Sequence, residues 1–114
     1  MKLLDRLFAA LLLLSAAGHT AGTVMFYSWP SEIFVWSLGA SLAAFSLAAI
    51  NLLRVNRAAD GALASICLVG SLGWLTIVVA FGVVIGNLVD PRVLMHAVAT
   101  AGLAAMSVRT LIRA

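Results

Sequence analysis

Four long apolar stretches, separated by short segments that hold almost all the charged residues, constrain this chain more than any other feature of its sequence. A helix needs about 20 apolar residues to cross the roughly 30 Å hydrocarbon core of a bilayer. The stretches lie at about residues 7–27, 33–53, 62–86 and 93–108. The pattern predicts an all-α fold: one integral-membrane four-helix bundle, running up-down-up-down, that occupies residues 1–114 as a single domain.

Composition excludes the main alternatives to a membrane protein. The chain has 114 residues, of which 64% are apolar and 10% charged, and its mean hydropathy is +1.16. Seven basic and four acidic residues could not cover the surface of a soluble domain of this size. Two prolines and one cysteine exclude collagen and a disulfide scaffold. We expect the lipid bilayer as the partner of this surface, and no nucleic acid.

The basic residues predict the orientation, because Lys and Arg are retained on the cytoplasmic side of short loops. Of the seven, only Arg92 falls on the other side of the predicted bundle. The six on one side are Lys2, Arg6, Arg54, Arg57, Arg109 and Arg113. We therefore expect a multi-pass protein of the bacterial inner (plasma) membrane with both termini cytoplasmic. The start of the chain also has features of a secretory signal, but we expect it to be retained as the first span.

Small residues recur every four positions within the predicted helices. Two GxxxG patterns, Gly18–Gly22 and Gly82–Gly86, are of the kind that lets membrane helices approach closely. Alanines follow the same spacing in the second and fourth stretches, at Ala40, Ala44, Ala48, Ala97, Ala101 and Ala105. This spacing predicts a tightly packed bundle, a homo-oligomer or a subunit that docks into a larger membrane complex.

Polar residues inside the predicted spans also follow helical spacing. They are costly in hydrocarbon unless they face protein or water, so we expect these faces to turn inward. The candidate residues are Ser15, His19 and Thr23 in the first span, Ser37 and Ser41 in the second, and His96 and Thr100 in the fourth. Hydrogen bonds between helices are the simplest role for the hydroxyl groups.

The two histidines lie at matching depths. His19 follows Arg6 by thirteen residues, and His96 precedes Arg109 by thirteen. At ~1.5 Å per residue, both rings lie about 20 Å from the cytoplasmic boundary. Because the first and fourth helices of such a bundle are usually neighbours, we expect a small-molecule site between them in the outer half of the membrane. Its lining would come from the five hydroxyl-bearing residues Ser15, Thr23, Ser37, Ser41 and Thr100.

The ligand of such a site stays open at this point. Paired imidazoles could hold a b-type haem, with Gly18, Gly22 and Gly102 leaving room for the porphyrin. His19 and His96 could instead bind a transition metal with Met25 or Met95, or serve a quinone, a lipid or a proton. Against all of these stands a plain role in which each histidine joins two helices by a hydrogen bond. The chain would then be a structural or assembly subunit.

The length and four spans are similar to those of the small multidrug resistance transporters. That resemblance implies a glutamate buried in the first helix, which couples proton and drug movement. Here the four acids Asp5, Glu32, Asp60 and Asp90 all fall at or outside the predicted spans. A small transporter of this kind would therefore lack a buried acidic coupling residue.

Catalytic features are sparse. The chain has no phosphate-binding loop, zinc-binding helix motif or nucleophile elbow, and we predict no catalytic residue. Asn87 and Asp90 would be the first residues to test for an enzyme. However, Asp90 followed by Pro91 is typical of a helix start. The single Cys67 is expected to be a small buried apolar side chain.

Overall fold

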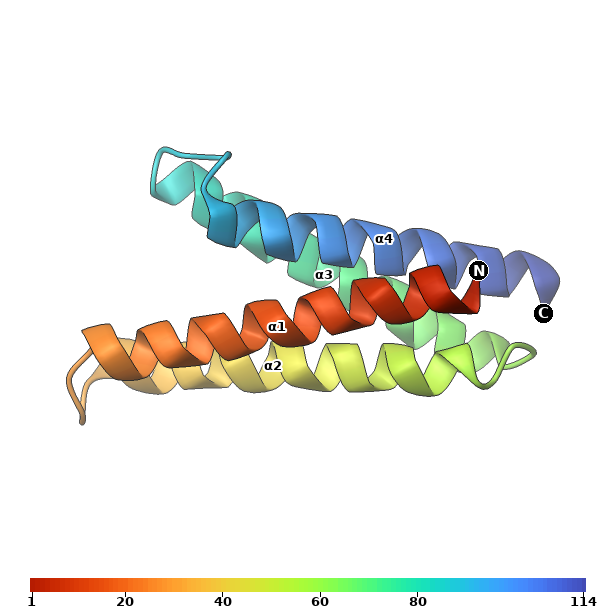
Figure 1. The fold of residues 1–114 in the computed structure, drawn as a ribbon, viewed down its shortest axis with the longest axis horizontal. Coiled ribbons are helices and arrows are strands. Elements are labelled where there is room, and N and C mark those ends of the chain that lie inside the picture. The colour runs from red at the N-terminus through yellow and green to blue at the C-terminus, as the bar shows by residue number, and fades with distance from the viewer.

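The computed structural model describes residues 1–114 and consists of four α-helices (Figure 1). They are α1 (Lys2–Phe26), α2 (Glu32–Val55), α3 (Gly61–Val84) and α4 (Pro91–Arg113). All four are long and apolar enough to cross a membrane. Their length, 23 to 25 residues, corresponds to roughly 35 Å at ~1.5 Å per residue. The all-α fold class and the four apolar helices are confirmed.

Local side-chain chemistry sets the starts of three helices. The Ser31 hydroxyl accepts a hydrogen bond from the backbone N–H of Phe34 at 3.3 Å, and the Asp60 carboxylate accepts one from Leu63 at 2.9 Å. These bonds satisfy amide groups that the first turn leaves free. At α4, Asp90 is the N-cap and Pro91 the first helical residue, so the predicted helix start is confirmed.

The helix boundaries differ from the predicted spans by one to five residues. Helix α1 begins at Lys2 rather than at residue 7, and α4 continues to Arg113 rather than ending at 108. The reason is that charged residues with long side chains are good helix formers, so each helix continues past its apolar stretch. Helix α3 ends earlier, at Val84, because Gly86 adopts a φ of 69°, which is a left-handed conformation that terminates a helix.

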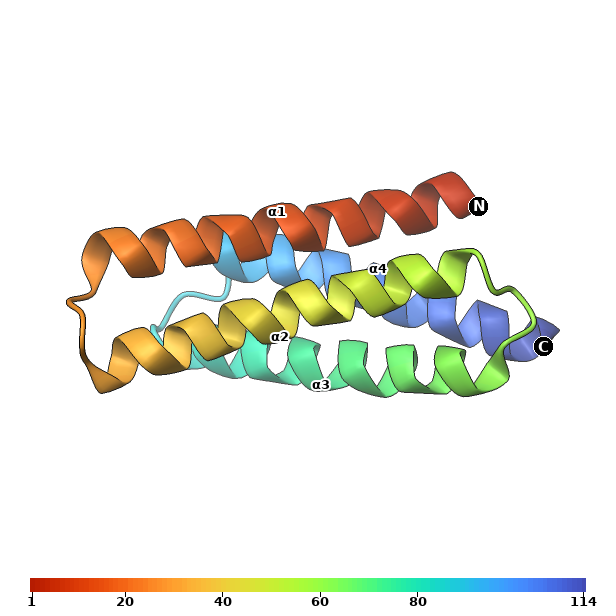
Figure 2. The same cartoon turned by 90° about the horizontal axis from the view of Figure 1, so that it is seen from below.

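The helices pack as two pairs that meet mainly through α1 and α4. Helix α1 packs against α2 and α4, and α3 packs against α4, whereas the α2–α3 contact is less extensive. Both termini and the α2–α3 loop lie at one end of the molecule, here called the terminal end (Figures 1 and 2). The α1–α2 and α3–α4 loops lie at the other, here called the loop end. The α3–α4 pair diverges from the α1–α2 pair toward the loop end (Figure 1).

Small side chains form most of the core. Its eight buried residues are Ala9, Leu12, Ala16, Ala44, Leu47, Ala48, Ala99 and Leu103. Large apolar side chains lie on the outside instead: Trp36, for example, is 72% exposed. This distribution suits helices that approach closely through small residues. On α4, however, the buried alanines are Ala99 and Ala104, whereas Ala101 and Ala105 of the predicted stripe are exposed.

The glycines differ in what surrounds them. A Cβ atom at Gly18 or Gly22 would meet nothing within 4 Å, so the first GxxxG pattern does not pack against another helix of this chain. Gly82 contacts the start of α4, but Gly86 lies in the loop and belongs to no helix interface. At Gly102 a Cβ atom would lie 2.5 Å from the ring of Phe8. The space that we expected at Gly102 for a porphyrin is therefore filled by Phe8.

Candidate functional site

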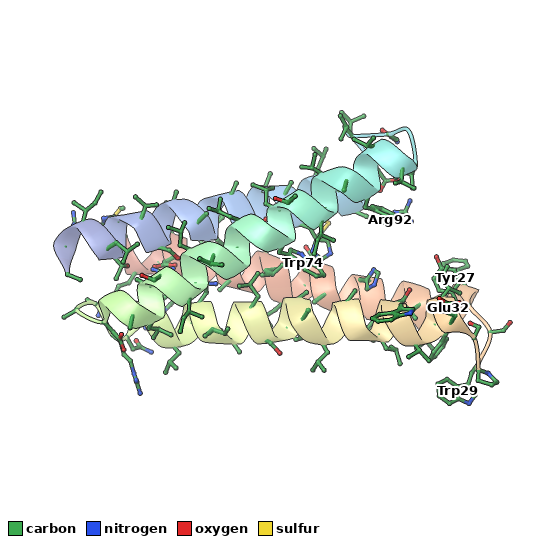
Figure 3. The ribbon with its side chains drawn as sticks, turned by 180° about the vertical axis from the view of Figure 1, so that it is seen from behind. Tyr27, Trp29, Glu32, Trp74 and Arg92 are labelled. Carbon is green, nitrogen blue, oxygen red and sulfur yellow. The ribbon has the colours of Figure 1, made fainter.

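His96 forms a side-chain hydrogen bond between α4 and α3. Its side chain is buried, and its Nδ1 atom accepts a hydrogen bond from Nε1 of Trp74 at 3.2 Å. The two ring centroids are 5.9 Å apart, with the planes tilted by 53°. Trp74 lies between the two helix pairs (Figure 3). Because Nδ1 is the acceptor, His96 is a neutral imidazole with its proton on Nε2.

His19, on the neighbouring helix α1, has a different environment. Its Nε2 atom donates a hydrogen bond to the backbone carbonyl of Ser37 on α2 at 3.1 Å, and the side chain is exposed. We expected this residue to face the interior together with Ser15 and Thr23. That expectation is wrong for His19: Ser15 and Thr23, one turn to either side, are buried, whereas the longer imidazole reaches the Ser37 carbonyl and stays exposed.

The two histidines are close in space but bonded to different helices. The surroundings of His96 include the backbone carbonyl of Ser15 and the imidazole of His19, both on α1. No hydrogen bond joins the two rings. Instead, His19 connects α1 to α2, and His96 connects α4 to α3. The histidines thus lie at one level of the α1–α4 interface, and each one stabilises a separate helix pair.

Four of the five predicted lining hydroxyls are satisfied within their own helices. Each donates a hydrogen bond to the carbonyl four residues earlier: Ser15 to Leu11, Thr23 to His19, Ser41 to Ser37, and Thr100 to His96. These four side chains are buried, as expected, while Ser37 is half-buried and contributes its carbonyl. The expected hydrogen bonds between helices are absent here, because a serine or threonine within a helix can bond its own backbone.

Cofactor ligation finds limited support in this geometry. No group of three or more His, Cys, Asp or Glu side chains is placed to hold a metal ion. The possible soft ligand Met25 is 74% exposed. Haem coordination by both imidazoles would require His19 to release the Ser37 carbonyl. A ligand that binds Nε2 of His19 would therefore have to break its hydrogen bond to Ser37.

The two residues considered for an enzyme hold the α3–α4 loop together. The Asn87 side-chain oxygen accepts a hydrogen bond from the Val89 N–H at 3.1 Å. Asp90 accepts bonds from the backbone and the guanidinium of Arg92, each at 2.9 Å. These hydrogen bonds to Arg92 lower the pKa of Asp90 to about 2. Such a carboxylate is a poor general base near neutral pH.

The strongest polar cluster lies at the terminal end and centres on Arg54, which is only 1% exposed. Its Nη2 atom lies 2.6 Å from Oδ1 of Asp5, and its Nη1 atom lies 3.1 Å from Oδ2. The guanidinium also donates to Asn51 Oδ1, to the hydroxyl of Thr110 and to the carbonyl of Met106. Arg54 therefore joins α1, α2 and α4 through a two-pronged carboxylate pair and neutral acceptors.

Helix α3, the remaining helix, approaches the same cluster through Cys67. This buried thiol of α3 lies close enough to the Arg54 guanidinium for a side-chain interaction. One turn further along α3, the Ser71 Oγ atom is the one buried side-chain polar atom without a hydrogen-bond partner. All four helices thus contribute polar groups to the terminal half of the core.

Sequence reasoning missed this cluster because it placed Asp5 outside the first span and treated Arg54 as a surface charge. Helix α1 begins before the predicted span and so includes Asp5, which is buried. The available signal was the spacing: Asp5 and Arg54 lie almost equally far along the chain from the Trp29–Pro30 turn. In an antiparallel helical hairpin such residues are level, and a buried carboxylate needs a cationic partner.

No protein-family model matches the chain, and neither characterised proteins nor solved structures give a significant match. Its function is therefore argued from the chemistry of its own residues.

Proposed function

We propose that the chain is an integral membrane protein whose helices run up-down-up-down across the bacterial inner membrane, with both termini in the cytoplasm. The exposed large apolar side chains support insertion, because such a surface is unfavourable in water. The basic residues support the orientation: the terminal end carries six Lys and Arg residues and the loop end only Arg92.

Reporter fusions test this orientation directly. Alkaline phosphatase, which is active only outside the cytoplasm, should be inactive when fused after Ala114 and active when inserted at Pro30 or Asn87. A cytoplasmic fluorescent reporter should show the reverse pattern. Phosphatase activity at Ala114 would contradict the proposed topology.

Within the membrane, the chain acts as a binding or accessory component with a small-molecule site around His19 and His96 in the outer half of the bundle. The observation that carries this proposal is the exposed imidazole of His19, which is held only by the Ser37 carbonyl. A polar ring at membrane depth is costly unless a ligand, water or protein covers it. A haem, a transition metal, a quinone or a lipid headgroup are the ligands that this chemistry accepts.

Ligand titration of the purified protein in detergent tests the site. Haem binding is measured first, by the Soret absorption in the oxidised and reduced states. Cu²⁺, Zn²⁺ and a short-chain ubiquinone are then added in separate titrations, in which the melting temperature of the protein is measured. A ligand of this site should lose its effect in His19→Ala and keep it in the control Thr76→Ala, whose exposed hydroxyl bonds its own helix. A ligand effect that is equal in both variants would exclude the histidine site.

A second candidate function, a structural or assembly subunit, is favoured by the hydrogen bonds of both histidines. Each ring is bonded to a neighbouring helix of the same chain, which is sufficient for a packing role. In that case the exposed face around His19 would be covered by a partner protein. Native mass measurement after mild solubilisation distinguishes the two candidate functions. A monomer that binds one of the ligands above favours the binding component, and a stable complex without ligand binding favours the structural subunit.

A further inference from the structure

An open cavity of about 460 Å³ lies at the terminal end, between the start of α1 and the ends of α2 and α4. Its inner wall includes the Asp5–Arg54 ion pair, and its other charged residues are Lys2, Arg109 and Arg113. The remaining lining is small or apolar, such as Ala58 and Ala59 of the α2–α3 loop. The cavity is thus an open hollow between three helix ends, with charged side chains on a partly apolar wall.

The charges in this cavity are not balanced. Both carboxylate oxygens of Asp5 accept hydrogen bonds from Arg54, so that pair neutralises itself. Lys2, Arg109 and Arg113 form no ion pair and no side-chain hydrogen bond. Three cationic side chains therefore surround one hollow without a counter-charge.

The other basic residues of the protein differ in this respect. Arg57 lies 3.9 Å from Asp60, Arg92 pairs with Asp90, and Arg6 donates to the side-chain oxygen of Asn56. None of these three lines the cavity. The unpaired cations are thus concentrated where the structure also provides a space.

We propose that this cavity binds a phosphate-bearing anion. Guanidinium and ammonium groups are the side chains that bind phosphate oxygens best, arginine through paired N–H donors and lysine as a point charge. The volume suits a phosphate with a small polar substituent such as glycerol. The anion is either the headgroup of an acidic phospholipid or a soluble phosphate ester. This site is separate from the one around the histidines and does not depend on it.

The position favours the lipid source under the proposed membrane insertion. The cavity lies at the helix ends that carry most of the basic residues, the level at which lysine and arginine meet anionic headgroups. Acyl chains could then extend along the exposed apolar surface of α1 and α4. A soluble ester would instead enter from the cytoplasm.

The test uses the full chain in detergent and two kinds of probe. Native mass spectrometry measures the Kd for dioleoyl phosphatidylglycerol and for dioleoyl phosphatidylcholine, which is zwitterionic. Calorimetry measures binding of glycerol 3-phosphate and inorganic phosphate. The variants are Arg109→Gln and Arg113→Gln, with Arg57→Gln as the matched control at the same end of the molecule.

We expect phosphatidylglycerol to bind more tightly than phosphatidylcholine, and each cavity variant to raise its Kd about fivefold, the effect of one basic residue at an anionic surface. Arg57→Gln should change the Kd less than about twofold. Arg109→Lys, which keeps the charge, should retain most of the binding and show that the fold is intact. Binding of glycerol 3-phosphate with the same dependence on Arg109 and Arg113 would support the site with a soluble ligand.

Two results would overturn the proposal. One is equal affinity for both lipids together with no binding of either soluble phosphate probe. The other is an equal loss of binding in Arg57→Gln and Arg109→Gln, which would mean that the general surface charge, not the cavity, attracts the anion. Both results leave the reporter fusions and the histidine titrations unaffected, so a failure here is distinguishable from a failure of the proposed function.

Discussion

Asp5 and Arg54 form a buried ion pair, although 49 residues separate them along the chain. The carboxylate lies in the first turn of α1 and the guanidinium in the last turn of α2. Two guanidinium nitrogens of Arg54 reach the carboxylate, at 2.6 and 3.1 Å. Asn51, Thr110 and the Met106 carbonyl accept hydrogen bonds from the same guanidinium. The α1–α2 register is therefore specified by a charge pair as well as by apolar packing.

Removing one member of this pair should destabilise the protein strongly. Asp5→Ala leaves the Arg54 guanidinium buried without a counter-charge, and the expected loss is about 3–5 kcal/mol of unfolding free energy. The measurement is helix content by circular dichroism during SDS titration in mixed micelles. Arg57→Ala, at an exposed ion pair, should cost less than about 1 kcal/mol.

A double substitution distinguishes the pair from simple loss of packing. Asp5→Leu combined with Arg54→Met removes both charges, and it should recover much of the stability lost in Asp5→Ala. If the double variant is less stable than Asp5→Ala, the charge pair does not account for the effect.

Gly102 and Phe8 should show strong coupling across the α1–α4 interface. A Cβ atom at position 102 would lie 2.5 Å from the Phe8 ring, so Gly102→Ala should destabilise by about 1–3 kcal/mol. Phe8→Leu in the same chain should relieve part of this cost, which a double-mutant cycle measures. Gly18→Ala, where nothing lies within 4 Å, serves as the control, and a loss there as large as at Gly102 would refute the packing explanation.

The Trp74–His96 hydrogen bond predicts a tautomer. With Nδ1 accepting from the indole N–H, ¹⁵N NMR should show His96 with an unprotonated Nδ1 and a protonated Nε2. Trp74→Phe removes the donor and should cost about 1 kcal/mol of stability while shifting the Nδ1 resonance. A protonated Nδ1 in the native protein would be incompatible with this geometry.

Ser71 offers a case in which a substitution should stabilise the protein. Its buried Oγ atom has no hydrogen-bond partner, so Ser71→Ala removes a desolvated polar group and should raise stability by about 1 kcal/mol. Ser107→Ala is the control, because the Ser107 hydroxyl donates to the Leu103 carbonyl at 2.8 Å, and it should be neutral or destabilising. A loss of stability in Ser71→Ala would mean that the hydroxyl has a partner.

Asp90 should titrate well below an ordinary aspartate. Hydrogen bonds from Arg92 lower its pKa from 3.8 to about 2. Because the folded pKa is the lower one, the contribution of this group to stability is fully present above about pH 4 and is lost as the pH falls toward 2. NMR titration of the carboxyl carbon measures the pKa directly, and Arg92→Gln should return it toward 3.8; an unchanged value in that variant would contradict the role of Arg92.

The number and type of helices could be predicted from the sequence because hydrocarbon thickness sets a length that the four apolar stretches meet. The start of α4 was equally predictable, since Asp90 and Pro91 have direct local roles. The ends of α1 and α4 were not predictable in this way. Apolar length reports where a helix crosses hydrocarbon, whereas Lys2 and Arg113 extend the helix beyond it.

The candidate site was predictable only in part. Depth along each helix predicts that His19 and His96 lie at the same level. Exposure depends on the rotation of each helix and on where each side chain finds a hydrogen-bond partner, and the spacing within one chain determines neither. Trp74 was the missing partner of His96. The hydrogen-bond partners of the hydroxyl groups were the least predictable, because Ser15 and Thr100 donate to backbone carbonyls of their own helices.

The placement of Arg54 has a mechanical consequence. Its bonds tie α1, α2 and α4 together at the terminal end, whereas the helix pairs separate at the opposite end (Figure 1). A rocking motion of one helix pair against the other would therefore pivot at Arg54, and its amplitude would grow toward the loop end, past the level of His19. The residue whose side chain donates the most hydrogen bonds would act as the fulcrum of this motion.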